Sequence, residues 1–205
     1  MFQESFTKLD IEDVAPVLEE VNPKLDGIPL DALNTTILAY DMPFYPGYRL
    51  LDISDHAISP PLKRFVIHKP GDVVILNWTN DPVYDLNHRL PIRLSDENVA
   101  EYVRFFFSYI RGRHGRFIVV EGVDDIKWKE EPPPAARKAI GKMLDLVHVK
   151  QRSDDGKNYI LEARVMFKDS LFKTDVMVNA QGDVVLTNEE LLVEDMPVQD
   201  DTFGQ

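Results

Sequence analysis

The stretch "KNYILEARVMFKDSLFKTDVMVNAQGDVVLTNEELLV" (residues 157–193) carries the most regular pattern in the chain. It holds three runs of alternating apolar and polar residues, separated by the short polar links "DS" and "QGD". Alternation with a period of two is typical of strands with one buried face, and short polar links favour tight turns. The run "DLVHVKQR" (145–152), which "SDDG" links to the next, adds a strand before these three. The stretch therefore predicts an antiparallel meander.

The alternation also assigns the two faces of the meander. Apolar side chains share one face, namely Tyr159, Leu161, Ala163, Val165 and Phe167 in one run and Phe172, Val176 and Val178, with Thr174, in the next. The opposite face carries Glu162, Arg164, Lys173, Asp175 and Asn179. Antiparallel sheets commonly bury one face and expose the other to water. We expect the apolar face to be core and the charged face to be wet.

Two helices are expected beside the meander. Ser95 is a good N-cap for a helix that runs to about Arg111, and "AARKAIGKML" (135–144) has helical apolar spacing. We expect the apolar face of the meander, Phe172 included, to pack on the helix at 135–144 as the central core. The fold class is therefore α+β, an antiparallel meander packed against helices. At fold level only, it resembles cystatin-like or NTF2-like architecture, and such an analogy implies no function.

The first half of the chain has weaker patterns. Residues 1–46 contain five prolines and are expected to form an N-terminal arm with a short helix at 10–21 and a second at 29–40. Strands are predicted for "YRLLDIS", "KRFVIHK", "DVVILNWT" and "PVYDLN", with a type II turn at Pro70 and Gly71. We expect residues 47–197 to form one α+β domain with a candidate hinge near 130–134. Residues 198–205 are expected to be a flexible acidic tail.

The distribution of charge narrows the classes of partner. The formal net charge is -12, with nine acids and two bases in residues 1–41 and seven acids and no base in residues 183–205. Acidic ends repel phosphate, so nucleic acid is not an expected partner. No apolar run approaches the roughly 20 residues needed to cross a bilayer, and the start lacks the pattern of a secretory signal, so we expect a cytoplasmic protein without membrane contact.

Recognisable catalytic chemistry is sparse. The chain has no cysteine, and its five histidines show no local metal-ligand spacing, so no cofactor or metal is predicted. Asp52, Asp55 and His56 form only a weak acid and histidine grouping, because adjacent side chains on an extended segment diverge. His68 and His148 are expected to point away from the core.

Two segments supply candidate binding residues. In "RGRHGRF" (111–117), Arg111 and Arg113 are expected to serve the helix end, which leaves Arg116 and His114 for a weak anion contact. The competing hypothesis is a phosphate or carboxylate ligand held by Arg113 and Arg116 with protonated His114. In "NWTNDPVYDLNHRLP" (77–91), candidate ligand-binding residues stand among turn formers. They are Trp78, Tyr84 and His88, for which turn and packing roles are the favoured interpretation.

These observations favour a noncatalytic interaction or assembly protein that self-associates as a homo-oligomer. The partner is another copy, a different protein or a small anionic ligand. Two alternatives stay open: a small-ligand-binding protein, and an enzyme whose polar site forms in a pocket between helix and curved sheet. A flat exposed apolar patch would favour the first hypothesis, a mainly apolar pocket would favour the ligand-binding protein, and a deep pocket with convergent titratable groups would favour an enzyme.

Overall fold

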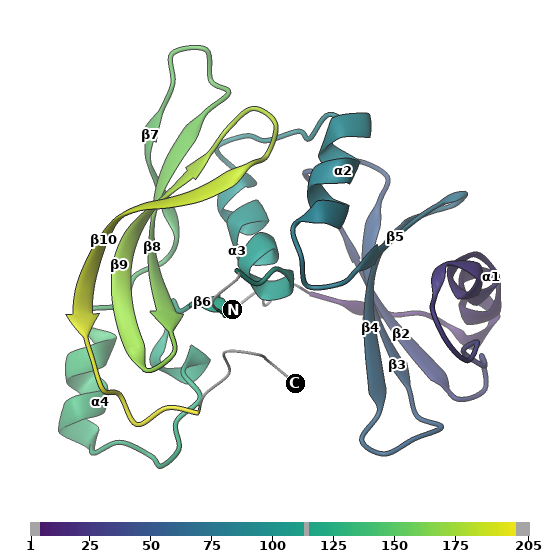
Figure 1. The fold of residues 1–205 in the computed structure, drawn as a ribbon, viewed down its shortest axis with the longest axis horizontal. Helices are drawn as coiled ribbons and strands as arrows, with labels where there is room; N and C mark the ends of the chain where they lie inside the picture. Colours follow the sequence, from purple (N-terminus) through teal and green to yellow (C-terminus); the bar gives the residue numbers. More distant parts are fainter. Residues whose placement is uncertain (1–4, 113–114, 200–205) are drawn as a thin grey trace. The chain divides into compact units, whose positions relative to one another are not determined.

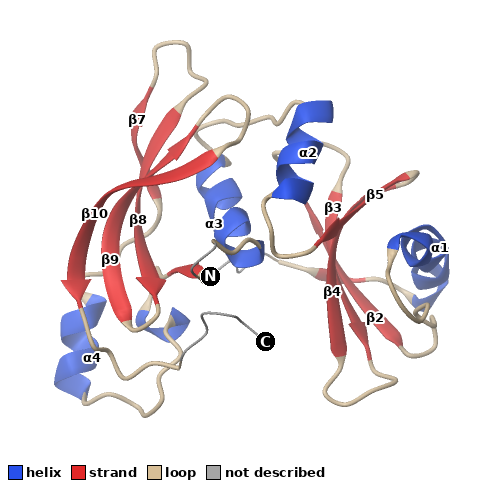
Figure 2. Cartoon of the chain, viewed as in Figure 1, coloured by secondary structure: helices blue, strands red, loops and turns tan. Residues whose placement is uncertain are grey.

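The computed structural model describes residues 5–112 and 115–199. The chain divides into two compact units, an N-terminal unit that ends at Arg93 and a C-terminal unit that begins at Leu94. Each unit contains an antiparallel sheet and helices (Figures 1 and 2), which confirms the α+β class. This boundary differs from those expected from the sequence. Residues 5–46, expected to form an arm, share a unit with residues 47–93, and the described chain is divided at Arg93 and not at 130–134.

The N-terminal unit is a five-stranded sheet in the order β1-β2-β3-β4-β5, with a helix on each side (Figure 1). Its strands are β1 (Thr7–Lys8), β2 (Thr35–Asp41), β3 (Arg49–Asp55), β4 (Leu62–Lys69) and β5 (Asp72–Leu76). Its helices are α1 (Ile11–Val21), the 3-10 turn η1 (Asn22–Lys24) and α2 (Asp81–Arg89). Val14, Val17, Leu18 and Val21 of α1 are buried in one cluster with Ile37, Leu51, Ile53 and Val66 of the sheet.

Two predictions for this unit are wrong. The segment 29–40 is not a helix: its second half is β2, in which Thr35, Ile37 and Ala39 are buried on one face and pair with β3. The run "PVYDLN" is not a strand but part of α2, where Pro82 lies in the first turn and needs no N–H partner. The predicted helix at 10–21 and the strands at 48–54 and 63–69 are confirmed.

The predicted turn between β4 and β5 is confirmed, and hydrogen bonds with residues of α1 and α2 stabilise it. Gly71 has φ 81°, and its N–H donates to Glu20 of α1 at 2.9 Å. The next residue, Asp72, accepts two hydrogen bonds from Arg89 of α2, at 2.6 and 2.9 Å. His68 is buried and lies 3.2 Å from Glu20, so the expectation that it points away from the core is wrong. Its side chain lies on the face that α1 covers.

The C-terminal unit contains the predicted meander. Its elements are α3 (Val99–Tyr109), β6 (Phe117–Val119), the 3-10 turn η2 (Val123–Asp125), α4 (Pro134–Gly141), β7 (His148–Arg152), β8 (Tyr159–Phe167), β9 (Ser170–Val178) and β10 (Val184–Val193). The sheet order is β10-β9-β8-β6, and β7 also pairs with β8. Along one edge of β8, β7 pairs with residues 159–162 and β6 with residues 165–167. The predicted meander of four strands is confirmed.

The inner face of this sheet is the face that carries Leu161 and Val176. Its side chains at positions 159, 161, 163, 165, 174, 176 and 178 are all at most 3% exposed. Helix α3 spans this face, since the Tyr102 hydroxyl donates to the Gly182 carbonyl in the β9–β10 turn at 2.6 Å and the helix also contacts β6. Seven side chains of α3 are buried. The core of the unit therefore lies between α3 and the inner face.

Helix α4 lies on the opposite, outer face, so the predicted packing of the helix at 135–144 is wrong. Only Ile140 and Leu144 of this segment join a cluster, and that cluster contains Met166 and Leu171, which alternate with the inner-face residues. No residue of α4 is fully buried, and Phe172 is only half-buried. The helix is short and has Ile140 as its one large apolar side chain, whereas α3 offers a much larger apolar surface to the sheet.

The end of the described chain is attached to this unit. Val198 is buried in the same cluster as Met166, and its neighbour Gln199 donates from its N–H to the Lys127 carbonyl at 2.8 Å. These two residues belong to the expected flexible tail, while its remainder, 200–205, lies outside the described residues.

The packing predicts a large cost for truncating the inner face. Leu161→Ala should lower the free energy of unfolding by about 3 kcal/mol, because Leu161 is fully buried and its loss leaves a cavity. Urea denaturation of the full chain measures this. Leu191→Ala is the control, since Leu191 is 49% exposed and should cost less than about 1 kcal/mol. Equal costs for the two variants would contradict the placement of the core.

Candidate functional site

The binding residues predicted in the N-terminal unit, Trp78, Tyr84 and His88, lie on α2 or in the segment just before it. Trp78 precedes α2 with φ 71°, and its ring meets Phe65 edge to face at 5.7 Å between centroids. Tyr84 is half-buried on α2, and His88 is exposed near the end of the same helix. Asn87 between them is buried and accepts a hydrogen bond from the Tyr45 hydroxyl at 2.6 Å. The segment therefore packs α2 against its own unit.

The arginine cluster belongs to the C-terminal unit. Arg116 is half-buried and donates from its guanidinium to the Ser108 carbonyl, at the last turn of α3, at 3.1 Å. Arg113 and His114 lie outside the described residues. Arg116 thus serves the end of the helix, the role that the sequence assigned to Arg111 and Arg113.

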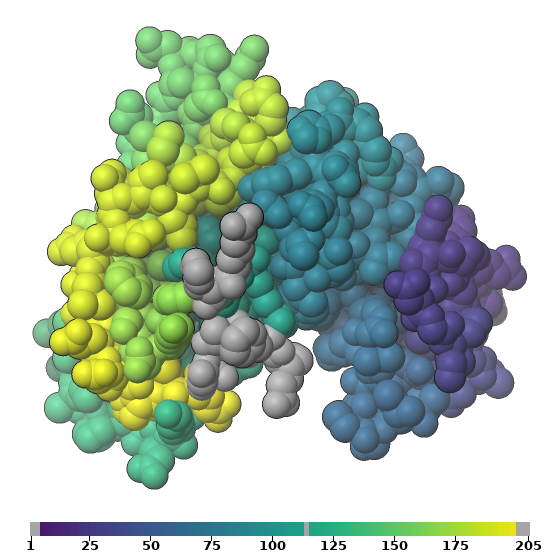
Figure 3. Space-filling view, viewed as in Figure 1, coloured from purple at the N-terminus to yellow at the C-terminus, as the bar shows by residue number. Residues whose placement is uncertain are grey.

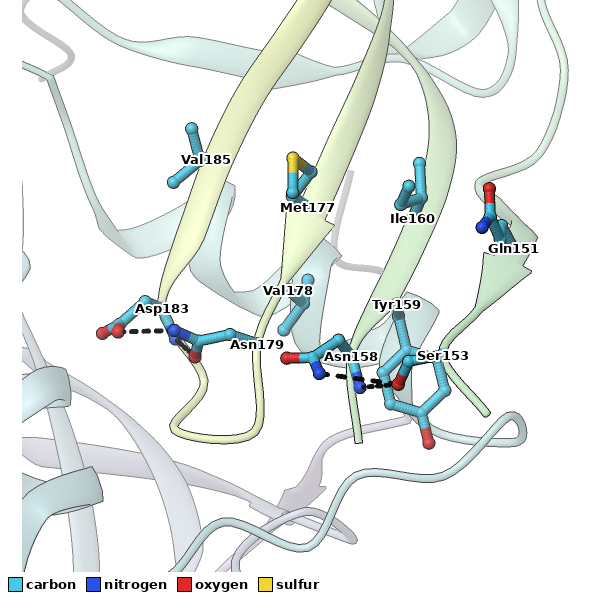
Figure 4. A pocket seen from close by; sticks show the side chains of 10 residues that line it. All are labelled: Gln151, Ser153, Asn158, Tyr159, Ile160, Met177, Val178, Asn179, Asp183 and Val185. Atoms are coloured by element: carbon cyan, nitrogen blue, oxygen red, sulfur yellow. Dashed lines mark hydrogen bonds between the residues drawn. The ribbon is translucent and has the colours of Figure 1, made fainter. Parts of the chain in front are cut away.

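A groove of about 290 Å³ opens on the outer face of the meander. Four side chains cross it in one row, each from a different strand, in the order Gln151, Ile160, Met177 and Val185 (Figure 4). The row follows the strand register, because Ile160 pairs with Gln151 and Met177, and Met177 pairs with Val185. Met177 is 44% exposed and Val185 is 54% exposed. The floor of the groove is therefore an apolar strip open to solvent.

Polar side chains from two turns line one end of the groove. The Asn179 amide donates to Asp183 at 2.8 Å, and Asn158 donates from its backbone N–H to the Ser153 hydroxyl at 3.0 Å (Figure 4). Because these groups bond one another within the β7–β8 and β9–β10 turns, the turns hold a fixed shape at the mouth of the groove.

A charged cluster lies beside the apolar strip on the same face. Arg164 donates to Glu162 at 2.8 Å, and Lys150 donates to Asp175 at 2.5 Å. Glu162 also lies 3.7 Å from Lys150 and 3.4 Å from Lys173, while Asn188 donates to Asp175 at 2.9 Å. We refer to Lys150, Glu162, Arg164, Lys173 and Asp175 as the charged cluster. It carries three cations and two carboxylates.

The cluster shifts the pKa values of its own members. Burial raises the pKa of Glu162, but hydrogen bonds and charges of Arg164 and Lys173 outweigh burial and hold it below its ordinary value. The Lys150 hydrogen bond, followed by that of Asn188, lowers the pKa of Asp175. The hydrogen bond to Asp175 raises the pKa of Lys150. The pKa shifts of Glu162, Asp175 and Lys150 therefore favour the charged form of each of these three groups.

Exposed apolar side chains lie in the groove and in the segment that precedes β7. Of the five large apolar side chains most exposed in the described part of the C-terminal unit, Met177 and Val185 lie in the groove. Two more, Met143 and Leu146, precede β7, where the Met143 carbonyl accepts a hydrogen bond from Arg164 and the Leu146 carbonyl lies 2.9 Å from His148. In the space-filling view, β9 and β10 form much of the surface of this unit (Figure 3). Two of these five side chains therefore lie in the groove, and two belong to the segment whose Met143 carbonyl accepts a hydrogen bond from Arg164.

The sequence contains a pattern that indicates this groove, namely apolar residues on the face of the strands that was assigned to charged residues. Ile160 and Met177 are apolar residues that lie two positions along their strands from the charged residues Glu162 and Asp175, on the same outer face. Apolar residues that pair on the outer face of neighbouring strands, as Ile160 and Met177 do, indicate an interaction surface more strongly than single ones. The sequence did place Glu162, Arg164, Lys173 and Asp175 on one wet face, but it did not bring Lys150 to them.

Other site types have little support in the residues described. Within residues 5–112 and 115–199, no three His, Cys, Asp or Glu side chains are grouped so as to hold a metal ion. None of the helices there is both long and apolar enough to cross a bilayer. Comparisons with protein-family models, curated proteins and solved structures gave no match. The analogy to cystatin-like and NTF2-like folds accordingly stays a prediction.

The cluster predicts a defined response to acid. Glu162→Gln should lower the free energy of unfolding at pH 7 by about 1–2 kcal/mol, because it removes charge-assisted hydrogen bonds from Arg164 and Lys173. Since the folded-state pKa of Glu162 lies below its ordinary 4.5, its contribution is present above that value and is lost as the pH falls through the folded pKa. The difference between wild type and variant should therefore shrink in acid.

Urea denaturation at several pH values between 7 and 3.5 measures this difference. Glu189→Gln, at an exposed position of β10, is the control and should change stability little at any pH. A difference between wild type and Glu162→Gln that stays constant over this range would contradict the prediction.

Proposed function

We propose that this chain is a noncatalytic interaction protein that binds another protein through the outer face of its meander. The observation that carries the proposal is the apolar strip of Ile160, Met177 and Val185, which lines a groove open to solvent on the same face as the charged cluster. Soluble proteins expose single apolar residues at random, whereas a contiguous patch rimmed by polar groups is typical of an interaction site.

The groove suits part of a protein better than a free small molecule. Its volume of about 290 Å³ is at the lower end of the range for small-molecule pockets, and two of its apolar side chains are already half-open to solvent. A partner surface would cover the groove and its rim together. One or two partner side chains would fill the strip between Ile160 and Val185.

The enzyme alternative has less support. The inner face, where a pocket between helix and sheet was considered, is filled by side chains that are at most 3% exposed. On the outer face, both carboxylates of the charged cluster accept hydrogen bonds from cations of the same cluster. Their pKa values are lowered, away from neutral pH, whereas a general acid or base works best with a pKa near the operating pH.

Partner capture from a lysate of the source organism tests the proposal. Met177→Glu should reduce binding of a captured protein at least about 10-fold, because a partner would have to bury an unpaired carboxylate in the apolar strip. Leu191→Glu is the matched control, since Leu191 is similarly exposed but lies outside the groove. Purified pairs then give dissociation constants.

Proteins that bind both variants as they bind wild type would contradict the proposed site. The expected homo-oligomer stays a prediction, and sedimentation velocity of wild type and Met177→Glu would show whether a second copy uses the same face.

A further inference from the structure

The outer face presents its positive groups to solvent and holds its negative groups beneath them. Lys150 and Lys173 have side chains that are 39% and 38% exposed, whereas Glu162 and Asp175 are 13% and 12% exposed. Arg164, the third cation, is as covered as the acids, at 12%. A partner that approaches this face therefore meets the two lysine ammonium groups first.

The lysines retain hydrogen-bonding capacity for a partner. An ammonium group has three N–H donors. Lys150 faces Asp175 at 2.5 Å and Glu162 at 3.7 Å, and Lys173 faces Glu162 at 3.4 Å. These contacts leave at least one donor on Lys150 and two on Lys173. The carboxylates, in contrast, are already surrounded by donors from the same face, Arg164 and Asn188 among them.

The distance from the apolar strip to the lysines matches the spacing of a strand. Met177, in the strip, and Asp175, under Lys150, are two residues apart on β9 and on the same face. Alternate residues of an extended chain are about 6.4–6.8 Å apart. A partner segment in extended form can thus place one side chain on Met177 and the side chain two residues away over the lysines.

We propose that the outer face selects an extended segment of a partner protein in which an apolar side chain and a carboxylate are two residues apart. The apolar side chain fills the strip formed by Ile160, Met177 and Val185, and the carboxylate accepts hydrogen bonds from Lys150 and Lys173. This inference rests on the proposed function, and it adds the chemistry of the partner.

Charge complementarity carries this choice of partner. A lysine or arginine at the second position would meet two ammonium groups without a free carboxylate to pair with, and a neutral amide would gain only ordinary hydrogen bonds. Charge-assisted hydrogen bonds are roughly twice as strong as neutral ones. Acidic segments are therefore preferred over basic and neutral segments of the same shape.

The probes are two tripeptides, acetyl-Leu-Ala-Glu-amide and acetyl-Leu-Ala-Gln-amide, titrated into the isotopically labelled full chain by NMR. We expect the Glu peptide to bind at least about 5-fold more tightly than the Gln peptide at low salt, with shifts at Ile160, Met177 and Val185 for both. Lys150→Gln combined with Lys173→Gln should bring the two affinities within about 2-fold. Lys168→Gln, at the β8–β9 turn, is the matched control and should retain the preference.

A second measurement serves in case the double variant loses its fold. In the wild type, 0.5 M NaCl should reduce the preference for the Glu peptide while the Gln peptide binds as before, because salt screens exposed charge pairs and not apolar contacts. Equal affinity of the two peptides, no preference change with salt, or no shifts at the groove would each overturn the inference. Equal affinity would leave the proposed function standing, whereas unchanged partner capture by Met177→Glu would remove the interaction site itself.

Discussion

The alternation of side chains along β8 is the constraint on which the C-terminal unit depends. This strand pairs with β9 along its whole length and with β7 and β6 in succession along its other edge. Its odd-numbered residues from 159 to 165 are buried under α3, and Glu162 and Arg164 face outward. A slip of one residue would turn both charged side chains into the core, so the pairing register is strongly specified.

The same alternation makes the outer face a composite surface. Next to β6, Met166 and Leu171 are covered by the segment that contains α4. In the middle of the face lies the charged cluster. At the other end, Ile160 and Met177 have no such cover in the described unit, although their chemistry suits burial. The outer face therefore has a covered apolar end, a charged middle and an apolar end that is open to solvent.

The sequence predicted the elements with a clear period and missed those whose period depends on tertiary contacts. The meander combined strict alternation with polar links, so its four strands were found. The run "PVYDLN" fits a period of two or of 3.6, and only the burial of Val83, Leu86 and Asn87 shows that it is helical. Likewise, Thr35 to Asp41 is a strand that pairs with β3 over seven residues. The β-branched run Thr35, Thr36 and Ile37 disfavours a helix, but it does not identify the partner strand.

The candidate site shows the same limit. Glu162, Arg164, Lys173 and Asp175 could be assigned to one face, because alternation within a strand fixes the side of the sheet. Lys150 could not, since the register between β7 and β8 shifts between Val149 and Gln151. A shift of this kind changes which side chains meet across the strands, and local sequence does not encode it. Nor does the sequence show which helix covers which face of the sheet, because α3 and α4 are both amphipathic and only tertiary packing distinguishes them.

The structure of the edge strand, β10, explains why a partner would bind the outer face of this sheet and not its edge. Strand β10 ends the sheet, and exposed edges readily pair with other chains. However, its pairing with β9 shifts register twice, and Asn188 has φ 51° at the first irregular segment. Glu189 and Glu190 are exposed at the same place. Bulges and charges of this kind disfavour strand addition along β10. The broad outer face, with its open apolar strip and exposed lysines, therefore remains the better surface for recognition.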